Sequence, residues 1–342
     1  MKVLVTGGTG FTGSHTAAAL AAAGHQVRLM VRDPAKVGQV FPLRGYSPDD
    51  VVVADMTDGD AVEAAFDGCH GVIHTAAVVD LRRRSARAVE EANTRGVEIV
   101  VGGAVRRGIP SIVHVSSLSV FLVRNGPPMS ASSPIVDGAS AYARSKAAAE
   151  RYVRGLQDAR APVGVCYPAG IIGPDDPGLS AMTAGLKSFM TSVFVLTSGG
   201  MQIVDVRDLA ALLVTLLELP PGPHRYVAAS PMLSWSLLYD LCCTLTGTHP
   251  RRIRVPGAVL RAAGSVGDVV KRLYDFDFPL TREGMDVTTG WPGADASATT
   301  RELGITFRDP AETLRDTLRW LFVAGHLTAD QAGTLAQEAM SP

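Results

Sequence analysis

Short apolar runs rich in β-branched residues alternate with longer runs of helical periodicity through the first half of the chain. The apolar runs predict strands at 2–6, 26–32, 50–55, 71–75, 111–116 and 162–167. The intervening runs predict helices at 14–23, 60–66, 85–107 and 141–157, and Gly24 and Gly108 mark the ends of two of them. This alternation is typical of a parallel sheet wound on both faces by helices, so we expect a doubly wound α/β fold with right-handed crossovers.

The pattern changes after Pro168, where the stretch PAGIIGPDDPG has no clear period. The later segment GGMQIVDVRDLAALLVTLLEL predicts a strand and a helix, and we expect the sheet to resume there. Shorter helices are predicted at 235–247, 257–274 and 310–322, while 328–342 fits either a short helix or a frayed end. We expect two domains interleaved in sequence. The sheet domain comprises 1–172 and 200–224, and a smaller, mostly helical domain of 173–199 and 225–342 supplies the substrate wall.

Composition excludes several classes of protein. The 342 residues carry 32 Lys and Arg against 33 Asp and Glu, a net charge of -1, so no basic surface for nucleic acid is expected. Four cysteines, Cys69, Cys166, Cys242 and Cys243, lack metal-ligand spacing, and we expect free thiols and no metal. No secretory pattern precedes the first strand, and the longest apolar run, 209–217, falls short of the ~20 residues of a membrane span. A cytoplasmic protein without an integral membrane segment is therefore expected.

A glycine-spaced turn follows the first strand, in VLVTGGTGFTG. Gly7, Gly10 and Gly13 allow a tight turn and let backbone N–H groups approach phosphate oxygens at the start of the next helix. A helix N-terminus favours an anion. The turn therefore predicts a seat for a dinucleotide pyrophosphate.

A second chemical signal lies on the helix predicted at 141–157. Tyr142 and Lys146 stand four residues apart in AYARSKAAAERYV, so both side chains leave one face. An ammonium beside a phenol lowers the phenol pKa from ~10 and makes it a general acid or base near neutral pH. Ser116 and Ser117 end a strand at the carboxyl edge of the sheet, where open α/β sheets bind ligands and a hydroxyl can hydrogen-bond a carbonyl oxygen.

In combination these motifs resemble the extended branch of the short-chain dehydrogenase/reductase family over nearly the whole chain. The segments that carry the resemblance are TGGTGFTG, ADMTD around Asp55, HTAA at 74–77, YARSK and YPAGIIGP at 167–174. VRDP, FPLTREGMDVTTGW and TRELGITFRDPAETLRDTLRWL resemble the subgroup of dihydroflavonol reductases and 3β-hydroxysteroid dehydrogenases. The resemblance implies a Rossmann sheet and NAD(P)-dependent chemistry.

The resemblance also implies roles for individual residues. Tyr142 exchanges the proton at the substrate oxygen, Ser117 holds that oxygen, and Lys146 binds the nicotinamide ribose and lowers the Tyr142 pKa. Hydride then moves between nicotinamide and the substrate carbon. Asn93, in ANTRG, matches an asparagine that supports a proton-relay water in relatives, and the alternative is a solvated surface amide. The expected cofactor contacts are Gly7, Gly10, Phe11, Thr12, Gly13, Arg32, Asp55, Met56, Thr75, Ala76, Ala77, Asn93, Tyr142, Lys146, Pro168 and Ile171.

The end of the second strand discriminates between the two nicotinamide cofactors. A carboxylate there accepts from the ribose hydroxyls, whereas an arginine neutralises a 2′-phosphate. Arg32 occupies this position, and Asp33, which precedes Pro34, is expected at a helix entry. We therefore expect a preference for NADP(H), with NAD(H) as the alternative. Asp55 and Met56 are expected at the adenine edge.

Three functions remain open from the sequence. The first is an NADP(H)-dependent oxidoreductase acting on an apolar ketone, aldehyde or secondary alcohol, because segments such as SAMTAGLKSFMTSVFVL and LSWSLLYDLCC are mostly apolar. The second is a sugar-nucleotide epimerase with tightly bound NAD. Arg251, Arg252 and Arg254 would hold a phosphate of its sugar-nucleotide substrate, unless they form a solvated edge. The third is a non-catalytic NADP(H)-sensing protein. The helices at 85–107 and 141–157 match a pair that forms dimer contacts in relatives, so a homodimer is expected.

Overall fold

The computed structural model describes residues 1–78, 86–273 and 281–340. Ser85 and Tyr274, expected at helix ends, lie outside the described residues. The main sheet has seven strands in the order β11-β6-β5-β4-β1-β2-β3. All six pairings are parallel, which confirms the predicted doubly wound sheet. The strands are β1 (Lys2–Thr6), β2 (Gln26–Val31), β3 (Asp50–Val53), β4 (Gly71–His74), β5 (Ser111–Val115), β6 (Val163–Pro168) and β11 (His224–Ala228).

The seventh strand differs from the expectation. The predicted strand after residue 200 forms as β10 (Ile203–Asp205), but it pairs with β7 (Gly170–Ile172) in a separate two-stranded sheet. The main sheet resumes only at β11, which begins at the boundary expected at 224 and extends past it. The intervening helix α7 (Val206–Glu218) first crosses the face of the sheet. The β11 segment is short and follows a proline-rich turn, so its strand pattern is not recognisable in the sequence.

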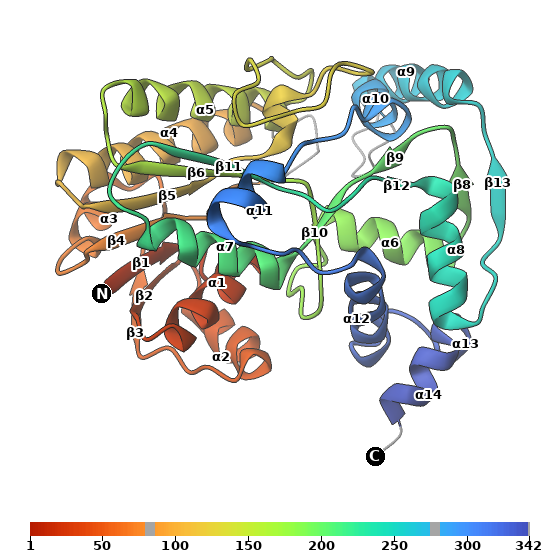
Figure 1. Cartoon of the computed structure of the whole chain (residues 1–342), viewed down its shortest axis with the longest axis horizontal. Coiled ribbons are helices and arrows are strands. Elements are labelled where there is room, and N and C mark those ends of the chain that lie inside the picture. Colours follow the sequence, from red (N-terminus) through yellow and green to blue (C-terminus); the bar gives the residue numbers. More distant parts are fainter. Residues whose placement is uncertain (79–85, 274–280, 341–342) are drawn as a thin grey trace.

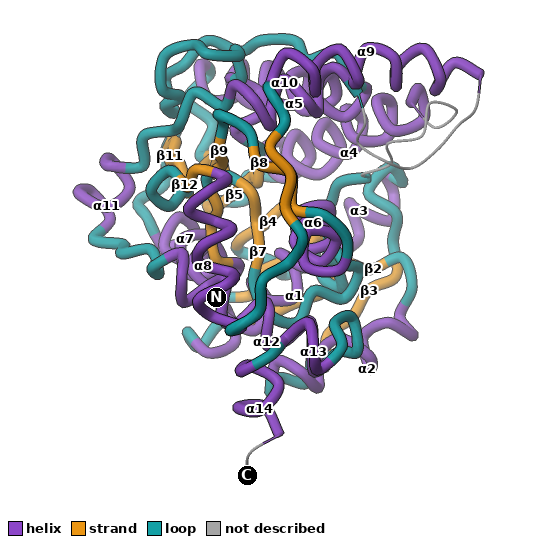
Figure 2. The backbone as a smooth tube through the Cα atoms, turned by 90° about the vertical axis from the view of Figure 1, so that its right-hand side faces the viewer, coloured by secondary structure: helices purple, strands orange, loops and turns teal. Residues whose placement is uncertain are grey.

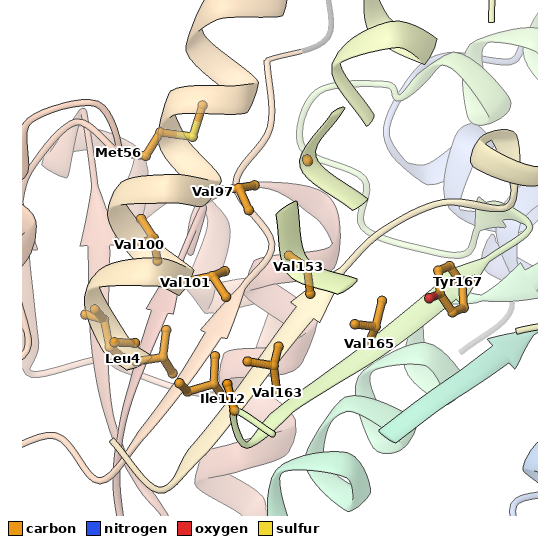
Figure 3. Packing of buried hydrophobic residues seen from close by; sticks show 14 of the residues in the cluster. Leu4, Met56, Val97, Val100, Val101, Ile112, Val153, Val163, Val165 and Tyr167 are labelled. Carbon is orange, nitrogen blue, oxygen red and sulfur yellow. The ribbon is translucent and has the colours of Figure 1, made fainter. Parts of the chain in front are cut away.

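Helices cover both faces of this sheet (Figure 1). One face carries α1 (Phe11–Ala22) and α7, and the other carries α3 (Gly59–Ala65), α4 (Ala86–Arg106) and α5 (Ala141–Asp158). Alternate strand residues such as Leu4, Ile112 and Val163 point to the second face and pack with valines of α4 and α5 (Figure 3). Each such side chain contributes roughly 1.5–3 kcal/mol on burial, so the sheet is a firm platform for the loops at its edge.

A second region lies beside the carboxyl end of the sheet (Figures 1 and 2). It has its own apolar cluster, which includes Phe194, Trp235, Leu238 and Leu318. Its helices are α6 (Ala181–Thr191), α8 (Trp235–Thr246), α9 (Gly257–Leu273), α10 (Arg282–Gly290), α12 (Pro310–Val323), α13 (Ala329–Ala332) and α14 (Thr334–Met340). Its short strands are β8 (Phe194–Leu196), β9 (Gly200–Met201), β12 (Leu233–Ser234) and β13 (Arg252–Arg254).

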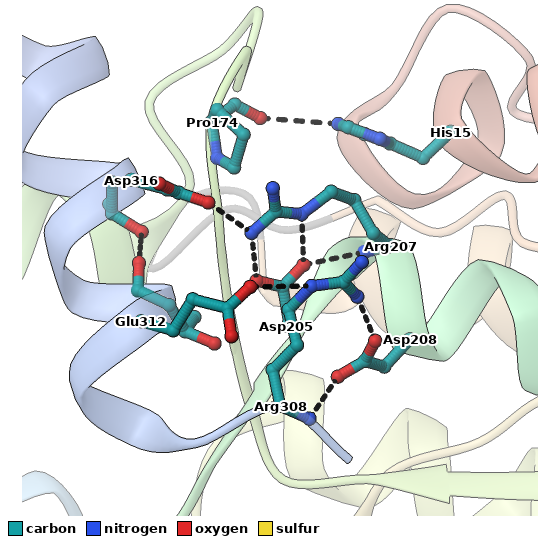
Figure 4. Close-up of polar contacts among 10 residues, drawn as sticks. His15, Pro174, Asp205, Arg207, Asp208, Arg308, Glu312 and Asp316 are labelled. Atoms are coloured by element: carbon teal, nitrogen blue, oxygen red, sulfur yellow. Dashed lines mark hydrogen bonds and ion pairs between the residues drawn. The ribbon is translucent and has the colours of Figure 1, made fainter. Parts of the chain in front are cut away.

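Two further contacts fix this C-terminal half to the sheet. The helix α11 (Ser297–Leu303) returns to β11, where the Thr299 hydroxyl donates to the Val227 carbonyl at 2.6 Å. At the start of α7, the Arg207 guanidinium lies 2.6 Å from Asp205 and 2.7 Å from Asp316 of α12 (Figure 4). These buried and half-buried ion pairs hold the second region in one position over the sheet edge. No helix in the described part of the chain is both long and apolar enough to cross a bilayer.

Candidate active site

The glycine turn between β1 and α1 excludes side chains for steric reasons. Gly7 has φ +69°, and a Cβ there would lie 2.9 Å from the Ala76 backbone. A Cβ on Gly13 would lie 2.2 Å from the Gly7 carbonyl oxygen. Gly10 caps α1 without a side-chain hydrogen bond, and its own N–H donates to the Gly7 carbonyl at 2.8 Å. The space that these glycines leave and the open N-terminus of α1 fit a dinucleotide pyrophosphate.

The amides expected at this pyrophosphate lie in the first turn of α1. The first hydrogen bond of the helix is donated by the Ser14 amide to the Gly10 carbonyl at 3.0 Å. The amides of Phe11, Thr12 and Gly13 therefore precede the helical hydrogen-bond ladder. These three donors are in the place where the sequence predicts phosphate contacts.

The end of β4 forms the next wall of this site. The Thr75 hydroxyl donates to the Thr6 carbonyl at 2.7 Å, and the Ala76 amide lies 3.4 Å from the Thr6 hydroxyl. Ala77 follows and is exposed. Pro168 ends β6, and Ile171 is half-buried in β7. These expected cofactor contacts therefore lie at or just beyond the ends of parallel strands, where open α/β sheets bind ligands.

The two charged residues directly after β2 have different surroundings. Arg32 is exposed immediately beyond the strand. Asp33 caps the short 3-10 helix η1 (Pro34–Lys36), and its carboxylate accepts from the Ala35 amide at 3.0 Å. Asp33 thus occupies the helix-entry role predicted from sequence, and Arg32 is left as the charged group at the strand end.

The two residues expected at the adenine edge have different surroundings. The Asp55 carboxylate accepts from the Thr57 hydroxyl at 2.6 Å and the Thr57 amide at 2.9 Å, and these bonds lower the Asp55 pKa. Met56 is buried and belongs to the core, where its sulfur would lie 2.7 Å from a Cβ on Gly96 of α4. Met56 therefore packs against α4, while Asp55 is half-buried at the strand end.

Ser117, Tyr142 and Lys146 come together above the carboxyl end of β5. Ser117 caps the 3-10 helix η4 (Leu118–Phe121), where its oxygen accepts from the Ser119 amide at 3.2 Å. The Ser117 side chain lies close enough to the Tyr142 phenol to lower its pKa. The Lys146 ammonium donates to the Val115 carbonyl at 3.2 Å and lies 6.0 Å from the centre of the Tyr142 ring. Residues 25 positions apart in the sequence thus share one site because α5 crosses over the end of β5.

The protonation of this group differs from the sequence expectation. Burial raises the Tyr142 pKa above its usual range, and the Ser117 side chain opposes this rise only in part. The expected lowering by Lys146 does not offset burial in the protein without cofactor, and it stays a prediction for the cofactor complex. Burial also lowers the Lys146 pKa to about 8, which the charge of Glu150 opposes. Tyr142 is accordingly a protonated phenol, ready to donate.

Asn93 is an internal tether. Its side-chain oxygen accepts from the Val78 amide at 2.7 Å, and its nitrogen donates to the Val78 carbonyl at 2.9 Å and the Ser145 hydroxyl at 3.1 Å. The side chain is buried, so the alternative of a solvated surface amide is wrong. Asn93 joins the loop after β4 to α5. A supporting role in proton relay stays a prediction.

Sequence reasoning missed several polar side chains around the site. Ser116, expected only as a strand-end neighbour, donates to the fully buried Glu150 at 2.8 Å. The four-residue interval between Lys146 and Glu150 repeats that between Tyr142 and Lys146 and could have indicated Glu150. Glu283 of α10 accepts from the Ser140 amide at 2.6 Å, at the N-terminus of α5. No local pattern joins two residues so far apart.

Two buried histidines lie beneath Lys146. His74 and His114 are register partners on β4 and β5, and their rings stack with centroids 5.5 Å apart. His74 contacts the Thr6 hydroxyl at 2.7 Å, while both ring nitrogens of His114 have no protein partner. Burial lowers the His74 pKa to about 3 and that of His114 well below its usual value. Both rings are therefore neutral.

The arginine cluster and the cysteines are the remaining candidate groups. Arg251, Arg252 and Arg254 are exposed on and beside β13, where the Arg252 guanidinium lies 4.7 Å from the Tyr239 ring centre. Within the described ranges the four cysteines are free, and no three His, Cys, Asp or Glu side chains gather to hold a metal ion.

Comparison with known proteins gives the family. The NAD dependent epimerase/dehydratase family matches residues 3–229. The chain belongs to this family. It is an NAD(P)-dependent enzyme of the short-chain dehydrogenase/reductase type, and its relatives include reductases and dehydrogenases.

Two relatives match along almost the whole chain. Sterol demethylase protein B of Methylococcus capsulatus is 26% identical over 341 residues, covering 94% of this chain and 98% of that protein. A putative dihydroflavonol 4-reductase of Synechocystis is 26% identical over 335 residues, covering 94% and 95%. The solved UDP-glucose-4-epimerase of Stenotrophomonas maltophila, with bound NAD and formylated UDP-arabinopyranose, is 21% identical with a TM-score of 0.76, covering 95% and 98%. This last likeness shows the fold alone.

Proposed function

We propose that this enzyme is an NADP(H)-dependent oxidoreductase that acts on an apolar ketone, aldehyde or secondary alcohol. The observation that carries the proposal is the cluster of Ser117, Tyr142 and Lys146 above the carboxyl end of β5, in which Lys146 is buried and the other two are half-buried. In the reducing direction, the protonated Tyr142 donates its proton to the substrate oxygen. Ser117 holds that oxygen, and Lys146 binds the nicotinamide ribose while it is anchored by the Val115 carbonyl.

The cofactor half of the proposal rests on the glycine turn and Arg32. The N-terminal amides of α1 receive the pyrophosphate in the space that Gly7, Gly10 and Gly13 leave open. Arg32 is exposed beyond β2 and pairs with a 2′-phosphate, whereas the Asp33 carboxylate is already bonded to a backbone amide. A bound NADP(H) supplies or receives the hydride.

The substrate half rests on the relatives and on the apolar composition of the second region. Half-buried apolar side chains there include Met182, Phe189 and Met201. One relative that matches along almost the whole chain is named for a sterol and another for a dihydroflavonol. These names and the apolar composition favour a hydrophobic carbonyl compound over a sugar nucleotide.

A sugar-nucleotide epimerase with tightly bound NAD is the second candidate. The full-length similarity to a solved UDP-glucose-4-epimerase supports it at the level of the fold. The exposed arginines of the β13 segment are available for a phosphate, and the Arg252 stacking on Tyr239 gives one of them a defined position. Such an enzyme inverts a sugar carbon without net oxidation.

The first test is calorimetric titration of cofactor-free protein with NADPH and NADH. We expect tighter binding of NADPH, and we expect this preference to disappear in Arg32→Ala because the 2′-phosphate loses its charge partner. Arg319→Ala removes another exposed arginine, on α12, and should keep the preference. A wild-type preference for NADH, or NAD that resists removal, would favour the epimerase. Tight NADPH binding without hydride transfer to any carbonyl compound would favour a cofactor-sensing protein.

A further inference from the structure

The helix that carries Tyr142 and Lys146 also carries a buried acidic residue at the same interval. Tyr142, Lys146 and Glu150 stand at successive four-residue steps of α5, so they share the face that looks onto the sheet. The Glu150 side chain is fully buried. A buried carboxylate costs several kcal/mol unless it is paired and hydrogen-bonded, so its presence one turn from Lys146 calls for a physical reason.

Three donors hold the Glu150 carboxylate. The Tyr167 hydroxyl donates to Oε1 at 2.6 Å, the Ser116 hydroxyl donates to Oε2 at 2.8 Å, and Arg154 Nε donates to Oε1 at 2.9 Å. Arg154 is itself fixed, because its guanidinium also donates to the Ser133 carbonyl at 3.2 Å. This arrangement is the one expected of an ionised carboxylate.

We propose that Glu150 is a positioning residue that keeps Lys146 in its cationic form within the buried site. This inference rests on the proposed function, in which Lys146 binds the nicotinamide ribose as a cation. The ammonium is buried, and among the described residues it donates to one acceptor, the neutral Val115 carbonyl. A neutral acceptor does little to offset the loss of solvent, whereas a fixed negative charge one helical turn away favours the charged amine directly.

The other ionisable groups around Lys146 cannot supply this negative charge. They are Tyr142 on α5, His74 on β4 and His114 on β5. Tyr142 stays protonated and the two histidines stay neutral above pH 6.5, because burial raises the pKa of the first and lowers those of the others. Glu150 is therefore the anion that acts on Lys146, and its carboxylate is also paired with the Arg154 guanidinium.

The direct test is an NMR titration of the lysine side chains in the full chain labelled with 13C at Cε. The sequence has five lysines, so the Lys146 signal can be assigned by its loss in Lys146→Arg. In the wild type the signal should titrate near pH 8. In Glu150→Gln the midpoint should fall by about one pH unit or more, because Lys146 then faces Arg154 without the carboxylate. An unchanged midpoint would overturn the proposal.

Two further variants guard against loss of the fold. Glu150→Asp retains the charge but moves it away by one methylene, so a smaller downward shift of the Lys146 midpoint is expected. This variant decides the question if Glu150→Gln does not fold. An unchanged midpoint in Glu150→Asp would then overturn the proposal. Val153→Ala removes a buried apolar contact of the same helix. It should lower stability and leave the Lys146 midpoint in place.

In Glu150→Gln the alkaline limb of the pH profile of kcat/KM should move to lower pH together with the NMR midpoint. If the midpoint moves in Glu150→Gln but no carbonyl compound is reduced by the wild type, Glu150 keeps its assigned role and the proposed function fails. If the wild type reduces carbonyl compounds and the midpoint does not move, the proposed function stands and the role of Glu150 fails.

Discussion

The two halves of the candidate site are built in opposite ways. At the start of α1 the binding groups are backbone amides, and three glycines keep side chains out of the space beside them. Above β5 the working groups are side chains, and they are buried with their charges: Lys146 and Glu150 lie on α5 among Ser116, Tyr167 and two neutral histidines. The first half depends on shape, and the second depends on electrostatics around the buried Lys146 and Glu150. Changes to the first should act on cofactor affinity, and changes to the second on proton transfer and pH dependence.

The largest expected effect is in the second half. Tyr142→Phe removes the hydroxyl that we propose donates to the substrate oxygen, and kcat should fall by roughly 10²–10⁴-fold, as is usual for a general acid. Binding of NADPH should change little, because the proposed pyrophosphate and 2′-phosphate contacts lie at α1 and Arg32. Steady-state kinetics and calorimetry on the same preparation separate the two. Comparable losses in both would mean that the halves are not independent.

The next effect concerns the glycine turn. Gly13→Ala places a Cβ 2.2 Å from the Gly7 carbonyl oxygen, so the turn must shift. We expect at least about a tenfold loss of NADPH affinity, since 1.4 kcal/mol of displaced hydrogen bonding suffices for that. Gly155→Ala is the matched control, because Gly155 also lies in a helix but a Cβ there meets nothing within 4 Å. Equal affinities in the two variants would show that the turn does not hold the pyrophosphate.

The neutral histidines give a smaller, pH-dependent effect on stability. His74 and His114 have pKa values below the ~6.5 of an unfolded histidine, so below that pH the unfolded state binds more protons than the folded state. Each histidine should remove up to about 1.4 kcal/mol of unfolding free energy per pH unit as the pH falls below 6.5.

Denaturant unfolding between pH 7.5 and 5 measures this slope. His114→Leu should reduce the slope, because an apolar side chain replaces two ring nitrogens that lack protein partners. The exposed His249→Ala should leave it as it is. A slope that is the same in wild type and His114→Leu would mean that His114 is protonated equally in both states.

The contrast also explains how far the sequence could predict the molecule. The glycine turn, the six strands up to β6 and the Tyr142 and Lys146 pair all follow from local spacing, and the structure has these strands and the main sheet. β11 was missed because five residues between turns carry little pattern, and only its pairing with β6 makes it a strand of the main sheet. The boundary between the two domains near residue 224 therefore stays a prediction.

Side-chain burial could not be predicted in the same way. The pKa of Tyr142 and the tether made by Asn93 depend on elements that meet only in the folded chain. The contact between Glu283 and Ser140 joins α10 to α5 across the two regions. A homodimer through α4 and α5 likewise stays a prediction from resemblance.

The most direct measurement is transfer of deuterium from NADPH labelled at nicotinamide C4 to apolar ketones and aldehydes, followed by mass spectrometry. We expect deuterium on the carbinol carbon of the product with wild-type protein, and a loss of this product in Tyr142→Phe. Absence of labelled alcohol from every carbonyl compound, together with inversion of a sugar nucleotide by protein that retains NAD, would contradict the proposed function.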